Sequence, residues 1–260
     1  MLDRAIFTAR RWTNAPRSIS LGPHAPLVRQ LRREGYAVLP GYYDADRCSR
    51  AIMEIDRTME AQPQAVRRDP LDADQRVFGI EHASPLASDF HRDSYLRAIG
   101  EAYYGSRLGN FSTLAGRLRF QPGNAGSGQG WHRDAFHFQF KAMVYLTDVA
   151  PENGPFQILA RSHRLFQVLR DTIRGRLAAA PQSRITDAQA DRLISAAPSR
   201  VRSLAAQRGT VILFDSSAIH RGSPIHADIR YALTNYYFQP EQITPKRYEE
   251  FAPFAQPVAE

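Results

Sequence analysis

The chain has 260 residues, 43% of them hydrophobic, and is long enough to bury the core of one globular domain. Its single cysteine, Cys48, excludes an internal disulfide and a cysteine-rich metal site, and favours a reducing, cytoplasmic location. The net charge is +8, yet of the 34 basic residues only Lys141 and Lys246 are lysines, and the arginines are spread along the whole chain. No tract alternates basic and aromatic residues, which argues against a nucleic-acid partner. No apolar run has the length of a membrane span, so no membrane partner is expected.

The beginning of the chain predicts an arm, a helix, a strand and a second helix. Residues 1–24 combine arginines and prolines without a period and are expected to form an arm over the surface. A short helix is predicted over 27–34 and a strand over 36–39, because glycine and proline end each of them. Asp44 is placed to cap a further helix that reaches about residue 60. We expect these helices to cover one face of a sheet.

The next segment alternates loops with regular elements. A loop is predicted over 62–74, a strand over 76–81, a helix over 93–104 and a long strand over 111–121. Residues 122–130 hold four glycines, but they lead into an extended run rather than a helix, which excludes a dinucleotide-binding loop. Flexibility at the mouth of a pocket is the favoured explanation for these glycines.

His132 and Asp134 lie at the start of an apolar run that has the composition of a strand. Side chains two residues apart share one face of a strand, so these two would project together while Arg133 points away. An imidazole and a carboxylate are two of the three protein ligands of a non-haem Fe(II) oxygenase, which needs two histidines and one carboxylate on one face of the ion. We therefore expect a second histidine from elsewhere in the chain.

His220 is the candidate for this second histidine. It follows a predicted buried strand over 210–214 and is placed in the loop after it, and Arg230 begins a strand-like run rich in aromatic and β-branched residues. Fe(II) and Asp134 leave the pocket with one positive charge, and a dicarboxylate such as 2-oxoglutarate brings two negative charges. Arg230 makes the balance neutral, and its planar fork fits the far carboxylate better than a lysine would.

A second His-x-Asp pair, His91 and Asp93, lies in a stretch with helical spacing of apolar residues. We interpret it as the start of a helix rather than as a metal site. The tripeptide His-Arg-Asp also occurs in the catalytic loop of protein kinases, which requires an asparagine five residues after the aspartate. Gln139 and Ala98 occupy those positions, and no Asp-Phe-Gly occurs, so the kinase hypothesis is excluded.

One strand face after the His-x-Asp pair carries Lys141, Met143, Tyr145 and Thr147. If this face lines a barrel, Met143 and Tyr145 flank the cosubstrate; packing in the core explains the same pattern equally well. The pair Asn153-Gly154 predicts a hairpin that joins this strand to residues 156–159 in an antiparallel pair.

Residues 165–200 are predicted to be a mostly helical insertion between the two halves of the metal site. Thr186 and Gln189 have the spacing of a capping box at the start of one helix. We expect the insertion to fold over the open side of the site as a lid. The tail after Phe238 is expected to be peripheral.

Several motifs taken together resemble the phytanoyl-CoA dioxygenase family of Fe(II)/2-oxoglutarate-dependent oxygenases. Each motif alone is weak, but the combination is specific. The resemblance covers roughly residues 30 to 240 and rests on WHRD at 131–134, YLTD at 145–148, ENGP at 152–155, SHR at 162–164, and His220 with Arg230.

The resemblance implies a mainly β fold with flanking α-helices, built on a double-stranded β-helix of the jelly-roll or cupin-like type, in a single domain over 1–260. It implies an enzyme that uses Fe(II), 2-oxoglutarate and O2 to hydroxylate a small-molecule substrate, with release of succinate and CO2. An anionic substrate is one use for the surplus positive charge. His163 is expected to be structural.

The resemblance also assigns roles to individual side chains. The metal-binding and catalytic residues are His132, Asp134 and His220. The cosubstrate residue is Arg230, with further cosubstrate contacts expected from Tyr145, Met143 and Gln121. Ala232 lacks the hydroxyl that related oxygenases place beside the arginine, so Tyr145 is the candidate for the missing donor.

Two other functions stay open at this point. A nucleic-acid demethylase of the same fold is favoured only by the basic charge, and such enzymes use a second arginine where this chain has Tyr236. A non-catalytic binding protein that kept the fold would lack the reaction, whereas the intact set of ligands with Arg230 favours an enzyme. Iron content and succinate formation without substrate would separate the two.

Overall fold

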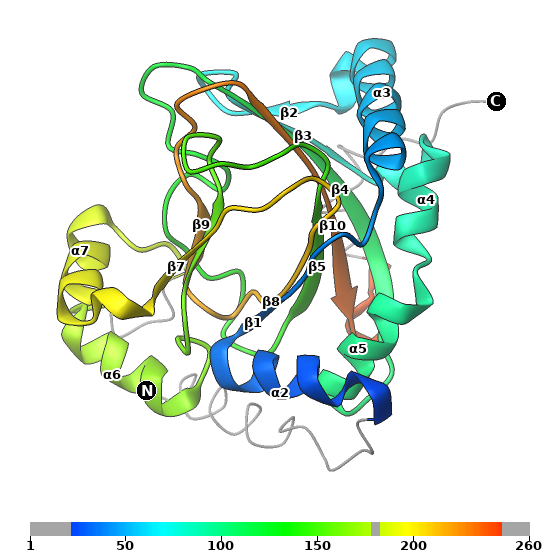
Figure 1. Ribbon diagram of the computed structural model, residues 1–260. Coiled ribbons are helices and arrows are strands. Elements are labelled where there is room, and N and C mark those ends of the chain that lie inside the picture. The colour runs from blue at the N-terminus through cyan, green and yellow to red at the C-terminus, as the bar shows by residue number, and fades with distance from the viewer. Residues whose placement is uncertain (1–21, 178–182, 246–260) are drawn as a thin grey trace.

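The computed structural model describes residues 22–177 and 183–245 (Figure 1). Most of the predicted arm and the end of the tail lie outside the described residues. The last three residues of the arm form a short 3-10 helix, η1 (Gly22–His24). In the described part of the chain, no helix is both long and apolar enough to cross a membrane.

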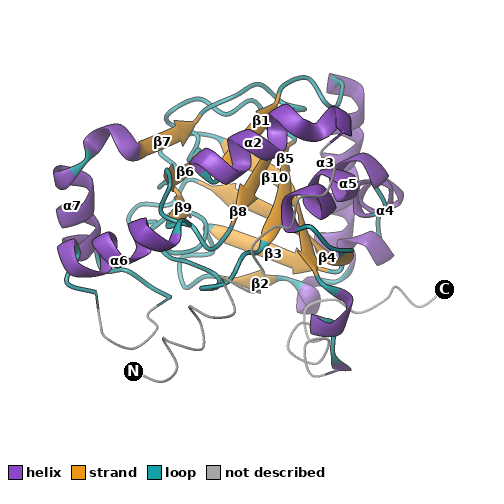
Figure 2. Cartoon of the chain, turned by 90° about the horizontal axis from the view of Figure 1, so that it is seen from below, coloured by secondary structure: helices purple, strands orange, loops and turns teal. Residues whose placement is uncertain are grey.

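Ten strands in the described residues form two antiparallel sheets, which can be followed in Figure 2. The large sheet has the order β1-β8-β5-β10-β4-β3-β2 and the small sheet the order β7-β6-β9. This arrangement is the predicted jelly-roll core. The strands are β1 (Tyr36–Leu39), β2 (Arg67–Arg68), β3 (Asp74–Phe78), β4 (Gly109–Arg119), β5 (Phe140–Tyr145), β6 (Phe156–Leu159), β7 (Val201–Leu204), β8 (Val211–Asp215), β9 (His220–Gly222) and β10 (Ile229–Phe238).

The helices fall into two groups. Figure 1 shows the first group along the large sheet and the second beside the small sheet. The first group is α2 (Ala25–Glu34), α3 (Ala45–Ala61), α4 (Pro85–His91) and α5 (Ser94–Tyr104), and the second is α6 (Leu165–Arg174) and α7 (Asp187–Ala196). Single 3-10 turns complete the set: η2 (Pro63–Ala65), η3 (Ile80–His82), η4 (Pro198–Arg200) and η5 (Pro240–Gln242).

Local sequence signals explain where these helices begin and end. The Asp44 side chain accepts a hydrogen bond of 2.7 Å from the amide of Arg47 and caps α3, as predicted. Gly35 ends α2 with a φ of 90°, a left-handed conformation that a residue with a side chain adopts only at a cost. The predicted capping box of α7 is present: the Thr186 side chain accepts from the amide of Gln189, and the Gln189 side chain accepts from the amide of Thr186.

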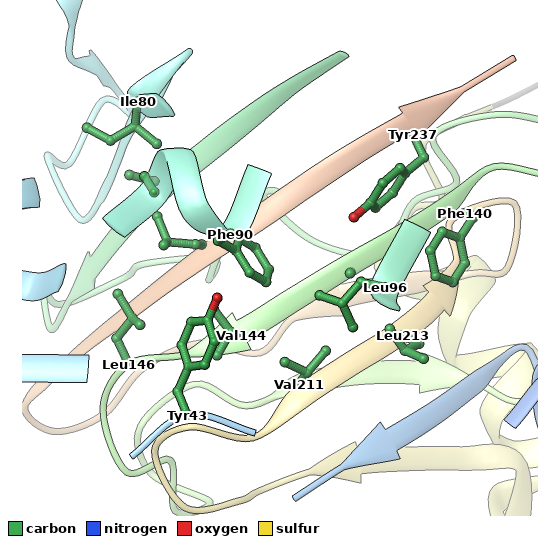
Figure 3. Packing of buried hydrophobic residues seen from close by; sticks show 14 of the residues in the cluster. Tyr43, Ile80, Phe90, Leu96, Phe140, Val144, Leu146, Val211, Leu213 and Tyr237 are labelled. Carbon is green, nitrogen blue, oxygen red and sulfur yellow. The ribbon is translucent and has the colours of Figure 1, made fainter. Parts of the chain in front are cut away.

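The main hydrophobic core lies between the first group of helices and the outer face of the large sheet. Figure 3 shows Phe90 and Leu96 from α4 and α5 packed toward Val144, Val211 and Leu213 of the sheet. All five side chains are fully buried or nearly so. Burying one such side chain contributes about 1.5–3 kcal/mol to the free energy of folding. Packing on the outer face therefore holds the large sheet in place, and with it the residues on its inner face.

The predicted hairpin around Asn153-Gly154 is wrong. Strand β6 pairs with β7 and β9 in the small sheet, while β5 belongs to the large sheet. The Asn153 side chain accepts from the amide of Ala150 and donates to the carbonyl of Ala227, so the turn carries the chain from one sheet to the other. A tertiary contact has overridden the local hairpin signal.

A largely buried ion pair within the helical insertion joins α6 to η4, the turn that leads into β7 of the small sheet. Asp171 of α6 is completely buried and pairs with Arg200 through two N–O contacts of 2.8 and 2.9 Å. Gln167 donates a further hydrogen bond of 2.8 Å to the same carboxylate. Both carboxylate oxygens therefore have partners, which makes burial of this charge tolerable.

We expect the change Asp171→Ala to lower the free energy of unfolding by about 3–5 kcal/mol, because it leaves the Arg200 guanidinium buried without its counter-charge. Urea unfolding measures this loss. The matched control is Asp148→Ala, which breaks an exposed pair with Arg208 and should cost about 1 kcal/mol or less. Equal losses in the two variants would contradict the role given to the buried pair.

Candidate metal centre

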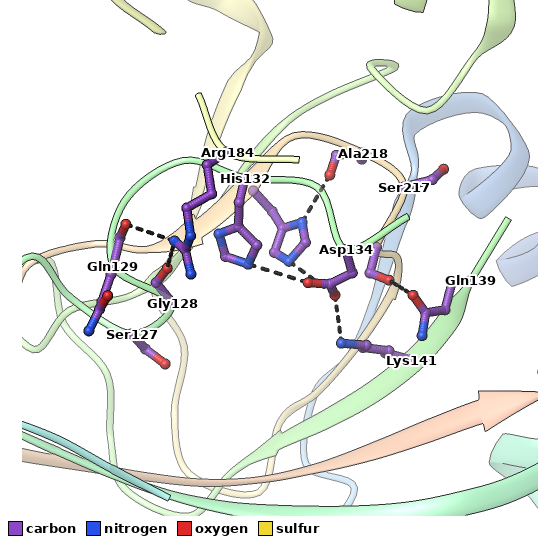
Figure 4. Close-up of polar contacts among 12 residues, drawn as sticks. Ser127, Gly128, Gln129, His132, Asp134, Gln139, Lys141, Arg184, Ser217 and Ala218 are labelled. Atoms are coloured by element: carbon purple, nitrogen blue, oxygen red, sulfur yellow. Dashed lines mark hydrogen bonds and ion pairs between the residues drawn. The ribbon is translucent and has the colours of Figure 1, made fainter. Parts of the chain in front are cut away.

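The structure brings His132, Asp134 and His220 together. Figure 4 shows His132 and Lys141 reaching toward the Asp134 carboxylate. One ligand atom from each lies within 4.8 Å of the others. The Nε2 atoms of His132 and His220 are 3.5 and 3.7 Å from the two oxygens of the Asp134 carboxylate. Among the described residues, these three are the only group of three or more histidine, cysteine and carboxylate side chains that converge in this way.

Hydrogen bonds to the backbone set which nitrogen of each imidazole is available. The Nδ1 atom of His132 is 2.9 Å from the carbonyl of Gly130, and that of His220 is 2.9 Å from the carbonyl of Ala218. A carbonyl only accepts, so each Nδ1 carries the proton and each Nε2 presents a lone pair. Two imidazoles with free Nε2 atoms facing one carboxylate can bind a divalent metal on one side.

The two histidines are also joined through their backbones. The amide of His132 donates to the carbonyl of His220 at 2.9 Å, and the amide of His220 donates back at 2.9 Å. The predicted regular strand at His132 is wrong, because the segment forms only single bridges before it bends at Asp134, whose amide bonds to Ser216. The predicted loop position of His220 is also wrong, since this residue begins β9.

Electrostatics favour a neutral histidine beside a charged aspartate. Burial and the neighbouring His132 lower the pKa of His220 to about 3, so its Nε2 stays free of a proton at neutral pH. Desolvation opposes the charge of Asp134, but Lys141, His220 and His132 outweigh it and hold the pKa of that carboxyl well below its usual range. His220 and Asp134 are therefore in the protonation states that metal binding requires.

Lys141 is part of the site, although no role was predicted for it. Its Nζ donates to Oδ2 of Asp134 at 2.6 Å and lies 3.6 Å from the centre of the Tyr236 ring. Desolvation opposes its charge, yet Asp134 and Tyr236 raise the pKa of Lys141 above its usual value, so the ammonium is retained. The alternation along β5 correctly placed this side chain on the inner face, which was the available signal.

The cluster opens into a pocket on the inner face of the large sheet. Arg230 and Met143, both predicted cosubstrate residues, belong to the lining, whereas Tyr145 and Gln121 do not. The Tyr145 hydroxyl is 3.1 Å from the carbonyl of Leu204 and accepts from a backbone amide of β6, and a role for Tyr145 or Gln121 stays a prediction. The remaining lining residues are Arg76, Leu114, Ser127, Gly128, Lys141, Phe156, Phe214, Gly222, Thr234 and Tyr236, with the three candidate ligands.

Arg76 of β3 is a second cation that the sequence analysis missed. It binds both oxygens of Asp74, at 3.1 and 2.6 Å, and donates to the Ser127 hydroxyl at 3.0 Å. Asp74 in turn accepts from the amide of Gly128 at 3.2 Å. This ion pair therefore anchors the glycine-rich loop to the large sheet. Its two members are neighbours on one face of β3, but their contacts with Ser127 and Gly128 join residues too far apart in sequence for a local motif to reveal.

Close contacts explain two of the four glycines of this loop, and flexibility at a pocket mouth stays a prediction for the loop. Gly128 has a φ of 85°, and a Cβ added there would lie 2.4 Å from the His132 ring. A Cβ at Gly126 would lie 2.3 Å from the carbonyl of Gly222. Any side chain at these two positions would displace a candidate metal ligand or the strand that carries His220.

Arg133 is buried behind the cluster and points away from it, as predicted. Its Nη1 donates to the carbonyls of Ser162 and Ser217. Ser162 also accepts, through its hydroxyl, from the amide of Ile219 at 2.7 Å. The arginine thus ties the segment of His132 to the turn that precedes His220, a supporting role that sequence reasoning missed.

The helical insertion contacts the ligand-bearing segment directly. The amide of Arg133 donates to the carbonyl of Ser183, and the amide of Ile185 donates to that of Trp131. The Arg184 side chain donates to the carbonyls of Gly128 and Gln129 at 2.6 and 3.1 Å. Residues 183–185 therefore extend the small sheet beyond His132, and a lid role for 165–200 stays a prediction.

The second His-x-Asp pair lies elsewhere and has other partners. The pair marks the start of α5, as predicted, with His91 as the last residue of the preceding helix α4 and its Nδ1 3.0 Å from the Thr113 hydroxyl. Asp93 caps α5 by accepting from the amide of Leu96. His163 is buried with its Nε2 3.2 Å from the carbonyl of Arg32, which is the structural position expected for it.

A jelly roll with two imidazoles and a carboxylate converging inside it defines a cupin-like protein with a candidate metal centre. The family is shown by a model described as phytanoyl-CoA dioxygenase (PhyH), which matches residues 31–231. The chain belongs to this family, and the predicted resemblance is confirmed.

Individual relatives agree with this assignment. Ectoine dioxygenase of Stutzerimonas stutzeri (strain A1501) is 26% identical over 156 residues, which cover 54% of this chain and 50% of that protein. The chain spans about half the length of most of the curated relatives that it matches.

Two solved structures are similar in fold. EctD from S. alaskensis with bound Fe has a TM-score of 0.66 at 18% identity and covers 86% of this chain and 80% of its own. The epimerase SnoN in complex with Fe3+, alpha ketoglutarate and nogalamycin RO has a TM-score of 0.62 at 19% identity, with 83% of both chains covered. Identities this low support the jelly-roll fold alone.

We expect His132→Ala and His220→Ala each to weaken binding of Mn(II) or Fe(II) by at least about a hundredfold, because two of three donors cannot close a facial site. Calorimetric titration of the metal into the protein measures this change. His91→Ala is the matched control and should bind the metal as the unchanged protein does. Full affinity in either ligand variant would place the metal elsewhere.

Proposed function

We propose that this protein is an Fe(II)- and 2-oxoglutarate-dependent dioxygenase that hydroxylates a small molecule and releases succinate and CO2. The observation that carries the proposal is that His132, Asp134 and His220 share one pocket with Arg230. Membership of the phytanoyl-CoA dioxygenase family supports it.

The donor set fits Fe(II). Two neutral imidazoles and one carboxylate are the ligands of the non-haem iron oxygenases, and they leave other positions of the ion open. Both Nδ1 atoms are already occupied by carbonyls, so both Nε2 atoms face the carboxylate without rearrangement. When bound, the iron supplies activation of O2, with electrons from decarboxylation of 2-oxoglutarate.

Arg230 fits the far carboxylate of the cosubstrate. Its guanidinium is buried and donates to the carbonyl of Gly154, and no ion pair joins it to a carboxylate among the described residues. A guanidinium has five N–H donors, so most of them are available to a ligand. Gly222 leaves the space beside it open, because a Cβ there would lie 3.1 Å from Nη2 of Arg230.

The rest of the lining separates the reacting groups from water. Met143, Phe156 and Phe214 form apolar walls between the metal ligands and the sheet. An apolar wall excludes water and strengthens the charge interactions inside the pocket. These side chains would hold the cosubstrate chain straight between Arg230 and the metal while the substrate approaches from the open side.

A small-molecule substrate is supported by what the similar proteins are described as acting on or binding. Relatives are named for ectoine, and one similar structure, HygX, holds nickel, 2-oxoglutarate and hygromycin B. We propose that the substrate of this protein is also a small molecule and that it is anionic. A cytoplasmic location, suggested by the single cysteine, is part of the same proposal.

The two alternatives have less support. The demethylase hypothesis requires a cation where this chain has Tyr236, and that ring instead packs against Lys141. A non-catalytic binding protein would not need a cation to hold a cosubstrate. Arg230 is nevertheless buried in the pocket, where it loses its hydration, and a cosubstrate carboxylate gives a reason for this cost. Succinate formed from 2-oxoglutarate by the iron-loaded protein in the absence of substrate would decide against the binding protein.

We expect Arg230→Lys to weaken binding of 2-oxoglutarate to the Mn(II)-loaded protein by about tenfold to a hundredfold, because one of two charge-assisted hydrogen bonds is lost. Calorimetry measures the dissociation constant. Arg117→Lys, on the outer face of β4 and paired with Asp56, is the control and should change nothing. An unchanged affinity in Arg230→Lys would remove this residue from the cosubstrate site.

A further inference from the structure

Lys141 lies beside the candidate metal ligands and has not been assigned a function. It is directly opposite Tyr236 in the pairing of β5 with β10. Its side chain is only 5% exposed, and its Nζ is 2.6 Å from Oδ2 of Asp134. The ammonium therefore sits inside the pocket, in contact with a candidate ligand of the metal.

The pocket holds more positive charge than the sequence suggested. Arg76 is matched by Asp74, and Lys141 is matched by Asp134. Arg230 has no described carboxylate partner, so these five groups carry one net positive charge before a metal binds. A divalent metal and the doubly negative 2-oxoglutarate cancel each other. One positive charge therefore remains, where the balance made without Lys141 came to zero.

Burying a lysine costs free energy because its ammonium loses hydration, so a buried lysine beside a metal position calls for a functional explanation. Removing an ammonium from water is unfavourable unless it is paired and hydrogen-bonded. Met143, the neighbour of Lys141 on the same strand face, is apolar, so packing alone does not require a charge at this position. The contact with Asp134 uses only one donor of the ammonium, and the remaining donors point to a ligand that has not yet been counted.

The hydrogen-bonding capacity of Lys141 agrees with this. An ammonium has three N–H donors. One is used by Asp134 and one faces the side chain of Tyr236. The third is available to a molecule in the pocket, next to the metal position.

We propose that Lys141 sets the charge of this pocket so that it accepts a substrate bearing one carboxylate, or a group of equal charge, beside the metal. This rests on the proposed function. Lys141 steadies Oδ2 of Asp134 with one hydrogen bond, and its remaining positive charge and free donor receive the anion of the substrate. The residue therefore determines specificity and also positions a metal ligand.

If Lys141 acts through its charge, its removal should change the affinities for a metal and for an anion in opposite directions, which a loss of packing would not do. The ammonium repels a divalent cation and competes with it for Asp134, but it attracts anions. Removing the charge should therefore strengthen metal binding and weaken anion binding. Each change should be about tenfold, as expected for one charge a few ångströms away in a partly screened site. Loss of packing would weaken both.

The experiment compares Lys141→Met, which removes the charge, with Lys141→Arg, which keeps it. Mn(II) is titrated first, then 2-oxoglutarate into the Mn(II) form, then acetate into the ternary complex, with acetamide as the uncharged probe. For Lys141→Met we expect about tenfold tighter Mn(II), about tenfold weaker 2-oxoglutarate and loss of acetate binding. Lys141→Arg should retain acetate binding, and acetamide should not bind.

The control is Arg208→Met, which removes one positive charge from an exposed ion pair and should change none of these affinities. Joint weakening of metal and anion in Lys141→Met, no change in either, or equal binding of acetate and acetamide overturns the inference. Absence of Mn(II) or 2-oxoglutarate binding by the unchanged protein would instead overturn the proposed function, so the two failures are distinguishable.

Discussion

The pair of backbone hydrogen bonds between His132 and His220 is the contact on which the rest of the site depends. It joins two segments that are far apart in sequence, and it fixes their register so that both Nε2 atoms meet one carboxylate. The Arg133 side chain reinforces the junction from behind, and the glycine-rich loop closes it from the side. The large sheet then supplies the charged residues of the pocket from its inner face.

The pocket shows how a small domain tolerates several buried charges. Each cation other than Arg230 is next to a carboxylate, and each of those carboxylates has a second donor from the protein or faces a metal position. Such pairs contribute little to stability once desolvation is counted. Stability comes instead from the apolar core on the opposite face of the large sheet, where helices α2 to α5 pack. Function and stability thus occupy opposite faces of one sheet.

Most of the strands and helices could be predicted from the sequence because their signals were local. The strands around Val211 and Tyr231 are short runs of β-branched and aromatic residues, and Asp44 has the side chain of a helix cap. The candidate ligands followed from a combination of motifs. What escaped prediction depends on the tertiary structure: the choice of neighbouring strands separates β5 and β6 into two sheets, and a bend at Asp134 brings its carboxylate to Lys141. Arg76 and Asp74 pair within one strand, and the contacts of this pair with the glycine-rich loop are the long-range part. The spacing of residues along β5 predicted the sheet face on which Lys141 lies, but not that it would pair with Asp134.

The bridge from His132 to Arg184 places the ligand-bearing segment inside an extended sheet rather than at its edge. A segment with a neighbour on both sides has few unpaired amides, so its backbone order does not depend on the ion. The proposed iron would then bind to a surface whose conformational entropy was already lost during folding, and its loss would leave no unpaired strand edge exposed to other chains.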